Sequence, residues 1–284
     1  MKYTEVNINI SPLEPHRDVL VYVLGDEGLY DSFEETPQGL KAYIPTKDFD
    51  EDFLKQVLSD NAAEATVTYQ VQEMPDKDWN AEWEKNYQPV LVEGYAKSCC
   101  VRAPFHPATP EATFDIVVNP KMAFGTAHHA TTSLMLSQIM DMDEAVQGMH
   151  VLDMGCGTAV LAILCAKMGA TRVDAVDVDD WAFRNAQENV AVNHCDNVIE
   201  CRLGDAASLP VMPTYDLVLA NINRNILLRD MPAYVAAMKE DGTLLLSGFY
   251  EADIPDLQQA AQSIGLETVG TTVLDDWAQM YLMK

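Results

Sequence analysis

Residues 151–179 read VLDMGCGTAVLAILCAKMGATRVDAVDVD, and this stretch decides the fold. Two short apolar runs, His150–Met154 and Arg172–Val178, are typical of buried strands, and the run Ala159–Met168 between them favours a helix. Asp153-Met154-Gly155-Cys156-Gly157 connects the first strand to this helix. A strand, a glycine turn, a helix and a second strand predict one unit of a parallel sheet.

The glycine turn and the end of the second strand indicate a nucleoside cofactor. Gly155 and Gly157 allow the backbone to turn tightly beside a ligand. The second strand ends at Asp177, whose carboxylate can accept hydrogen bonds from ribose hydroxyls. A dinucleotide site would continue as G-x-G-x-x-G, but residues 158–160 are Thr, Ala and Val. Asp153 also adds negative charge where a pyrophosphate needs positive potential, so the stretch favours a sulfonium and an ammonium, as in S-adenosylmethionine, over NAD.

The remainder of the chain after residue 179 continues the alternation of helices and strands. This order predicts a mostly parallel sheet that is covered on both faces, with ligands at the carboxyl ends of its strands. The expected helices are Trp181–Val192, Ile226–Met238 and Ile254–Ile264, and the expected strands are Ile199–Leu203, Asp216–Ala220, Thr243–Gly248, Glu267–Leu274 and Gln279–Met283.

The first 75 residues predict a smaller α+β domain. Alternating apolar residues, helical patterns and turn residues give the order β-α-β-β-α-β, which is the ferredoxin-like arrangement. The expected elements are a strand around Val6–Ile10, a helix Leu13–Leu24, strands Leu29–Phe33 and Leu40–Ile44, a helix that begins at Asp48–Asp52, and a strand Val67–Val71.

A linker over residues 76–105 is expected to join this domain to a catalytic domain of residues 106–284. Trp79, Trp83 and Tyr87 recur at i, i+4 and i+8, so they share one side of a helix. Such an aromatic stripe favours packing between elements over a cofactor site.

Composition restricts the partners and the compartment. The chain has 18 basic and 44 acidic residues, a formal net charge of −26, which disfavours a nucleic-acid backbone and favours a basic partner; the alternative is that the acidity only aids solubility. The six cysteines lack metal-ligand spacing, and we expect reduced thiols and no bound metal. No apolar run is long enough for a membrane span, and the N-terminus lacks a signal-peptide pattern, so we expect a cytoplasmic protein. Its oligomeric state does not follow from the sequence, and a monomer is the default expectation.

Several motifs together resemble one family. Residues 120–132, PKMAFGTAHHATT, are similar to the P-x-x-A-F-G-T-G-x-H-x-T-T signature of the ribosomal protein L11 methyltransferases, which are class I methyltransferases. The tryptophan helix, Ala220-Asn221-Ile222 and Leu246-Ser247-Gly248 also match that family. The resemblance implies a Rossmann-like catalytic domain, a ferredoxin-like domain that captures ribosomal protein L11, and methyl transfer from S-adenosylmethionine to lysine ε-amines and the N-terminal α-amine of that protein.

The resemblance also implies roles for individual residues. Thr132, Gly155, Asp177 and Asn221 would contact S-adenosylmethionine. We further hypothesise that Asn221 is the catalytic residue and orients the neutral acceptor amine with its carbonyl oxygen. The remaining cofactor contacts implied by the signature, the glycine loop and the related enzymes are Phe124, Gly125, Asp153, Gly157 and, beside adenine, Asp205.

Alternative roles stay open for several of these residues. Thr132 is also suited to cap a helix, Asn221 is also suited to a turn, and His129 fits either a structural hydrogen bond or direct action in methyl transfer. Phe124 and Phe249 are expected to line an apolar channel that disfavours a charged amine.

Three departures from the family pattern motivate the second of two rival functions. Alanine replaces glycine at residues 127 and 159 and proline at residue 130, and alanine tolerates positive φ poorly. The rivals are a methyltransferase for another protein or a small molecule, and a cofactor-binding assembly module without catalysis.

Overall fold

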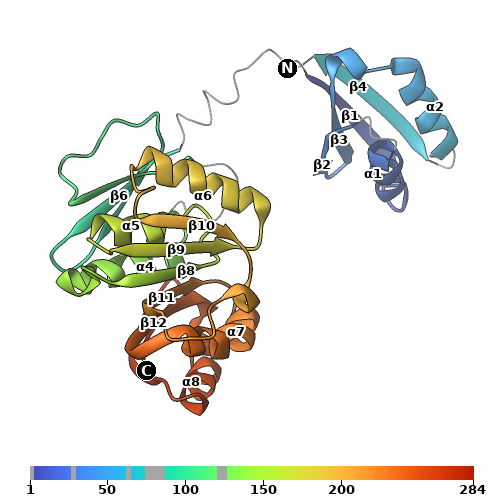
Figure 1. Ribbon diagram of the computed structural model, residues 1–284. Coiled ribbons are helices and arrows are strands. Elements are labelled where there is room, and N and C mark those ends of the chain that lie inside the picture. Colours follow the sequence, from blue (N-terminus) through green and yellow to red (C-terminus); the bar gives the residue numbers. More distant parts are fainter. Residues whose placement is uncertain (1–2, 27–29, 62–64, 74–86, 120–126) are drawn as a thin grey trace. The chain divides into compact units, whose positions relative to one another are not determined.

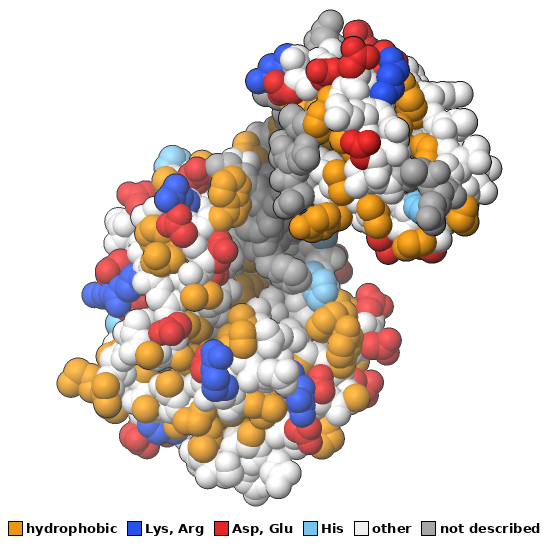
Figure 2. All heavy atoms as spheres, turned by 90° about the vertical axis from the view of Figure 1, so that its right-hand side faces the viewer, with side chains coloured by type: hydrophobic (Ala, Val, Ile, Leu, Met, Phe, Trp, Pro, Cys, Tyr) orange, Lys and Arg blue, Asp and Glu red, His pale blue; other side chains and the backbone are white. Residues whose placement is uncertain are grey.

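The computed structural model describes residues 3–26, 30–61, 65–73, 87–119 and 127–284. The chain forms two compact units, Met1–Asn86 and Tyr87–Lys284 (Figure 1). Acidic side chains lie on the surface of both units (Figure 2).

The first unit is a four-stranded antiparallel sheet with two helices. Its sheet has the order β2-β3-β1-β4, which with the chain order β-α-β-β-α-β confirms the predicted ferredoxin-like domain. Val6 and Ile8 of β1 pack with Leu20 of α1 and Leu54 of α2 in one apolar cluster. The elements are β1 (Tyr3–Ser11), α1 (His16–Asp26), β2 (Ser32–Thr36), β3 (Gly39–Pro45), α2 (Glu51–Asn61) and β4 (Thr66–Glu73).

One strand of this unit lies later in the chain than the sequence pattern predicts. The expected strand Leu29–Phe33 is observed as β2, Ser32–Thr36. Thr36 pairs with Gly39, so a connection of two residues fixes the register of the hairpin. Tyr30 is buried ahead of the strand instead of within it.

The second unit is built on a seven-stranded sheet in the order β10-β9-β8-β11-β12-β14-β13. Neighbouring strands from β10 to β12 are parallel, and β14 runs antiparallel to both of its neighbours. The predicted mostly parallel sheet is therefore confirmed. The strands are β8 (His150–Met154), β9 (Arg172–Asp177), β10 (Ile199–Leu203), β11 (Tyr215–Asn221), β12 (Met238–Tyr250), β13 (Glu267–Leu274) and β14 (Trp277–Met283).

Helices cover both faces of this sheet. Val151 of β8 packs with α4, α5 and α6, whereas the next residue, Leu152, packs with α7 and α8. Because successive side chains of a strand point to opposite faces, a strand buried on both faces has to be apolar at consecutive positions. The helices are α4 (Ala130–Asp141), α5 (Val160–Lys167), α6 (Asp180–Val192), α7 (Arg224–Ala237) and α8 (Ile254–Ser263).

A small three-stranded sheet precedes α4 and was not predicted. It consists of β5 (Val90–Glu93), β6 (Ser98–Arg102) and β7 (Phe114–Val117). Val101 and Ile116 from this sheet are buried in the same cluster as α4 and α5. Residues 87–105, which the sequence analysis assigned to the linker, therefore carry two strands of the second unit.

Two histidines hold the beginning of the second unit. The ring of His106 accepts a hydrogen bond from Ala103 N–H at Nδ1 (3.2 Å), so its Nε2 carries the proton and donates to the carbonyl oxygen of Tyr87 (2.8 Å). His128 Nε2 lies 3.1 Å from the carbonyl oxygen of Gln88. The Tyr87 ring also contacts both imidazoles. Trp79 and Trp83 of the predicted aromatic stripe lie outside the described residues.

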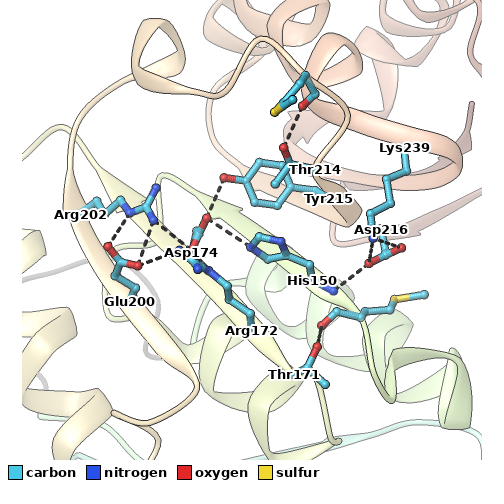
Figure 3. Close-up of polar contacts among 12 residues, drawn as sticks. His150, Thr171, Arg172, Asp174, Glu200, Arg202, Thr214, Tyr215, Asp216 and Lys239 are labelled. Atoms are coloured by element: carbon cyan, nitrogen blue, oxygen red, sulfur yellow. Dashed lines mark hydrogen bonds and ion pairs between the residues drawn. The ribbon is translucent and has the colours of Figure 1, made fainter.

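A polar network ties the amino ends of the parallel strands together (Figure 3). Asp174 of β9 is buried and accepts a hydrogen bond from Tyr215 Oη of β11 (2.8 Å). Arg172 and Arg202 form ion pairs with the same carboxylate at 3.1 and 3.5 Å, and His150 Nε2 lies 3.3 Å from it. Desolvation and the Asp174 hydrogen bond both raise the pKa of Tyr215. This network lies at the edge of the sheet opposite the carboxyl ends where ligands are expected.

Candidate active site

The glycine loop after β8 is fixed against the end of β9. The backbone N–H groups of Gly155 and Cys156 both donate to the carbonyl oxygen of Val176, at 2.8 and 3.1 Å. Gly155 has φ +69°, and Gly157 has φ +55°. These left-handed conformations favour glycine, so the two glycines of the sequence motif allow the turn that they predicted.

Asp177 lies at the end of β9 and closes the other side of the loop. Its Oδ2 accepts a hydrogen bond from Gly157 N–H (2.8 Å), and its Oδ1 accepts one from Asp179 N–H (3.0 Å). The side chain is 8% exposed. Two backbone donors therefore fix the orientation of this carboxylate at the rim of the sheet.

Thr132 and Asn221 meet next to the same loop although 89 residues separate them. Asn221 is the last residue of β11, and Thr132 is buried in the first turn of α4. Asn221 Nδ2 donates to Thr132 Oγ1 at 3.4 Å. His129, not Thr132, is the N-cap of α4, and it accepts from Thr131 N–H (3.4 Å).

Two glycines make room for the residue after Asn221. A Cβ atom on Gly155 would lie 2.4 Å from Ile222 Cγ2, and one on Gly248 would lie 2.4 Å from the Ile222 carbonyl oxygen. Gly248 also has φ +93°. Ile222 is thus packed between the loop after β8 and Gly248 of β12. A larger residue at position 155 would collide with the Ile222 side chain, and one at position 248 would collide with the Ile222 backbone.

These residues surround one cavity of about 460 Å³ along the carboxyl edge of the sheet. Its described lining residues include Gly155, Asp177 and Asn221, and none of them is Lys or Arg. The cavity size falls in the range of small-molecule sites. The full described lining is His129, Thr131, Gly155, Gly157, Asp177, Val178, Ala182, Asn221, Ile222, Asn223, Gly248 and Trp277.

Asp153 lies below the loop and is buried, so it is not the accessible negative charge that the sequence predicted beside the cofactor. Its side chain is buried, and its Oδ2 accepts a hydrogen bond from Ala162 N–H (3.1 Å). Burial, together with the nearby charge of Asp177, raises the pKa of Asp153 to about 7. Asp153 shares a second cavity of about 20 Å³, enough for one water molecule, with Thr132 and Asn221.

The other predicted site residues have different outcomes. Phe124 and Gly125 lie outside the described residues. Asp205 is exposed and accepts a hydrogen bond from Ala207 N–H (3.0 Å) at the start of a 3₁₀ turn. The neighbouring Gly204 N–H donates to the Asp177 carbonyl oxygen (2.8 Å).

The expectation that Phe249 lines a channel is wrong: it is 1% exposed in the core beneath α7 and α8. The bulge between residues 247 and 249 turns its side chain to that face.

Sequence reasoning missed several residues of the cavity wall. Ile222 directly follows Asn221, so its position next to a strand end was a usable signal. Val178 follows Asp177 and is 76% exposed, an unusual exposure for a valine. Trp277 had no local signal, because it reaches the site only through the insertion of β14 beside β12.

The residues present fit a nucleoside cofactor without phosphates. The Asp177 carboxylate suits ribose hydroxyls, and apolar Val178, Ala182 and Ile222 suit a base and an alkyl chain. The described lining has no Lys or Arg side chain that could form an ion pair with a pyrophosphate. Strand order, glycine loop and strand-end acid together define a class I S-adenosylmethionine-dependent methyltransferase fold.

Comparison with known proteins names the family. The chain belongs to the ribosomal protein L11 methyltransferase (PrmA) family, whose model matches residues 16–284. It is 42% identical to a ribosomal protein L11 methyltransferase of Phocaeicola vulgatus over 100% of both chains. It is 45% identical to one of Porphyromonas gingivalis, over 94% of this chain and 91% of that one.

A solved structure supports the fold. The ribosomal protein L11 methylase of Lactobacillus delbrueckii subsp. bulgaricus superposes with a TM-score of 0.56 at 24% identity, covering 68% of this chain and 96% of that one. Within the described residues, no helix combines the length and apolarity that a membrane crossing requires. No group of three or more His, Cys, Asp or Glu side chains in the described parts of the chain is placed to hold a metal ion.

Proposed function

We propose that this chain transfers methyl groups from S-adenosylmethionine to lysine ε-amines and the N-terminal α-amine of ribosomal protein L11. The observation that carries the proposal is the cavity that Gly155, Asp177 and Asn221 line together. The names of the relatives at 42% and 45% identity supply the substrate.

Several residues would hold the cofactor. Asp177 would bind the ribose hydroxyls, and Gly155 and Gly157 would let the loop backbone approach the methionine part. Thr132, Asp153 and Asn221 lie beside that loop, while Phe124, Gly125 and Asp205 stay predictions from the family signature and from related enzymes. When bound, S-adenosylmethionine supplies an electrophilic methyl group on a sulfonium.

Asn221 would orient the acceptor amine. Its Nδ2 is directed at Thr132 Oγ1, which leaves the carbonyl oxygen Oδ1 to accept an N–H of the neutral amine. A lysine with a pKa near 10.4 is almost fully charged at neutral pH, and transfer into a cavity with apolar walls disfavours the charged form. Holding the nitrogen lone pair about 3 to 3.5 Å from the methyl carbon on its axis would supply most of the catalysis.

The first unit would capture the substrate. Residues 1–75 contain 5 basic and 15 acidic residues, a charge that complements a basic protein and disfavours direct nucleic-acid readout. Ribosomal protein L11 as substrate also fits a cytoplasmic location. We expect the enzyme to act as a monomer, because one chain supplies all the proposed cofactor contacts.

Methyl incorporation from labelled S-adenosylmethionine into purified ribosomal protein L11 tests the proposal. We expect transfer by the natural chain and loss of both cofactor binding and transfer in Asp177→Ala. Asn221→Ala should bind cofactor more weakly and transfer much more slowly, and full turnover and affinity in this variant would refute its role.

Two other results would identify the rival functions. Tight cofactor binding without transfer to any protein would indicate an assembly module. Transfer to another protein or a small molecule, without dependence on residues 1–75, would indicate a different methyltransferase.

A further inference from the structure

The cavity crosses five neighbouring strands, and its two ends have different chemistry. From β9 to β14 its lining residues follow the strand order: Asp177, Gly155, Asn221, Gly248 and Trp277. Neighbouring strands lie about 4.8 Å apart, so Trp277 is roughly 19 Å from the Asp177 strand. In S-adenosylmethionine the sulfonium is one carbon from the ribose ring. A ribose held by Asp177 therefore places the methyl group near the middle of this row, and the Trp277 end is left for the acceptor.

The wall at this end is aromatic. The Trp277 ring lies against the Tyr250 ring, with centroids 4.2 Å apart and planes inclined by 31°. His129 meets Trp277 edge to face at 4.6 Å. Tyr250 is 51% exposed, so the pair extends from the cavity to the surface.

Hydrogen bonds hold the backbone that carries the two rings. Tyr250 N–H donates to Asp253 Oδ2 (3.1 Å), and Glu251 N–H donates to the Asp276 carbonyl oxygen (2.9 Å). Asp253 in turn forms an ion pair with Arg224 at 3.1 Å. The Glu251 hydrogen bond joins the segment after β12 to the β13–β14 hairpin, and Tyr250 pairs with Trp277 in the strand register, so the backbones that carry the two rings are held side by side.

We propose that Trp277, supported by Tyr250, is the specificity-determining residue that receives the acceptor lysine through its aromatic face. The inference rests on the proposed amine substrate. An indole face attracts an ammonium group by a cation–π interaction and also packs against the methylene stem of a lysine. It therefore binds the charged lysine at the entrance before the amine loses its proton near Asn221.

Three variants separate an aromatic role from simple apolar packing. Trp277→Leu keeps apolar bulk and removes the π face, Trp277→Phe keeps a π face, and Tyr95→Leu is the control at a 97% exposed aromatic residue. We expect Trp277→Leu to raise KM for ribosomal protein L11 about fivefold or more, with kcat and the Kd for S-adenosylmethionine changed less than about twofold. Trp277→Phe should recover most of the KM, and the control should match the natural chain.

The same experiment can overturn the inference. Equal KM values for the Leu and Phe variants would show that only apolar packing matters. A Kd for S-adenosylmethionine that is clearly larger in Trp277→Leu than in the natural chain, measured by calorimetry, would show that the indole binds the cofactor instead of the acceptor. If the natural chain transfers no methyl group to ribosomal protein L11, the proposed substrate is wrong, and the binding of lysine peptides to the natural chain still tests the aromatic wall.

A measurement on the natural chain does not depend on how the variants fold. Two synthetic lysine peptides are compared, one with trimethyllysine and one with its neutral carbon isostere, which has the same shape without the charge. A cation–π wall should bind the charged peptide about fivefold more tightly or better. Equal affinity for the two peptides would refute the inference.

Discussion

Replacement of Asp153 by asparagine tests the energetics at the base of the site. The carboxyl group is buried, and its hydrogen bond from Ala162 N–H can be accepted equally by an asparagine carbonyl. Asp153→Asn therefore keeps the shape and the hydrogen bond while it removes the ionisable group.

The size and sign of the effect follow from the pKa. Burial raises the pKa of Asp153 from the usual value of 3.8 to about 7. Between these values the folded protein binds more protons than the unfolded chain, so the free energy of unfolding falls as pH rises. About three pKa units at 1.36 kcal/mol each correspond to a penalty of about 4 kcal/mol at pH 8. At pH 5 the penalty is only about 2 kcal/mol, because the pH is just above the lower of the two pKa values.

The comparison between two pH values isolates this penalty. The asparagine side chain of the variant does not titrate, so the stability gain of Asp153→Asn over the natural chain should grow by about 2–3 kcal/mol from pH 5 to pH 8. In a unit of this size that corresponds to roughly 5–10 °C in Tm, measurable by calorimetry of the cofactor-free protein. A gain that is the same at both pH values would show that the pKa of Asp153 is not raised.

Three further predictions concern other parts of the catalytic unit. Gly248→Ala should lower cofactor affinity and turnover more than about tenfold, because its Cβ would lie 2.4 Å from a backbone oxygen beside the site. The control Gly265→Ala also has positive φ, but its Cβ would meet nothing within 4 Å, so it should lose only about 1 kcal/mol of stability. Asp174→Asn should cost about 3 kcal/mol in chemical unfolding, against about 1 kcal/mol for Tyr215→Phe, and equal losses would contradict the central role of the carboxylate. Ala159→Gly should change the free energy of unfolding by less than about 1 kcal/mol. The variant removes the strain of an alanine in the left-handed conformation, but it also loses a buried methyl group and makes the unfolded chain more flexible. A larger change would mean that one of these effects dominates.

Both folds were predictable where the sequence pattern is local. Strand Glu267–Leu274 was predicted to the residue, and the order of elements identified both units. The sheet of β5 to β7 was missed because its strands are short and belong together only through packing on α4 and α5. The shifted strand β2 was set by the hairpin connection, which apolar alternation alone does not specify.

The sequence predicted the site residues that directly follow strands, but not the contacts that depend on how distant elements pack. Gly155 and Asp177 follow strands whose carboxyl ends form one edge, so their proximity followed from topology. The contact of Asn221 with Thr132 depended on where α4 lies and was not predicted; the family resemblance had placed each residue at the cofactor site. Trp277 depended on an antiparallel insertion, which no spacing in the sequence reveals.

The two alanines at family glycine positions show how packing can compensate for backbone strain. Ala127 and Ala159 have φ of 63° and 62°, the left-handed conformation that made these departures a reason to consider lost catalysis. The conformation costs about 1–2 kcal/mol for an alanine. The two residues are 2% and 0% exposed, so their methyl groups are buried. Burial of such a group contributes about 0.8 kcal/mol, and alanine also restricts the unfolded chain by a similar amount. Since these contributions nearly cancel, alanine can hold both turns in the shape that glycine would give, and the substitutions by themselves supply no physical reason to expect a cofactor loop that fails to bind.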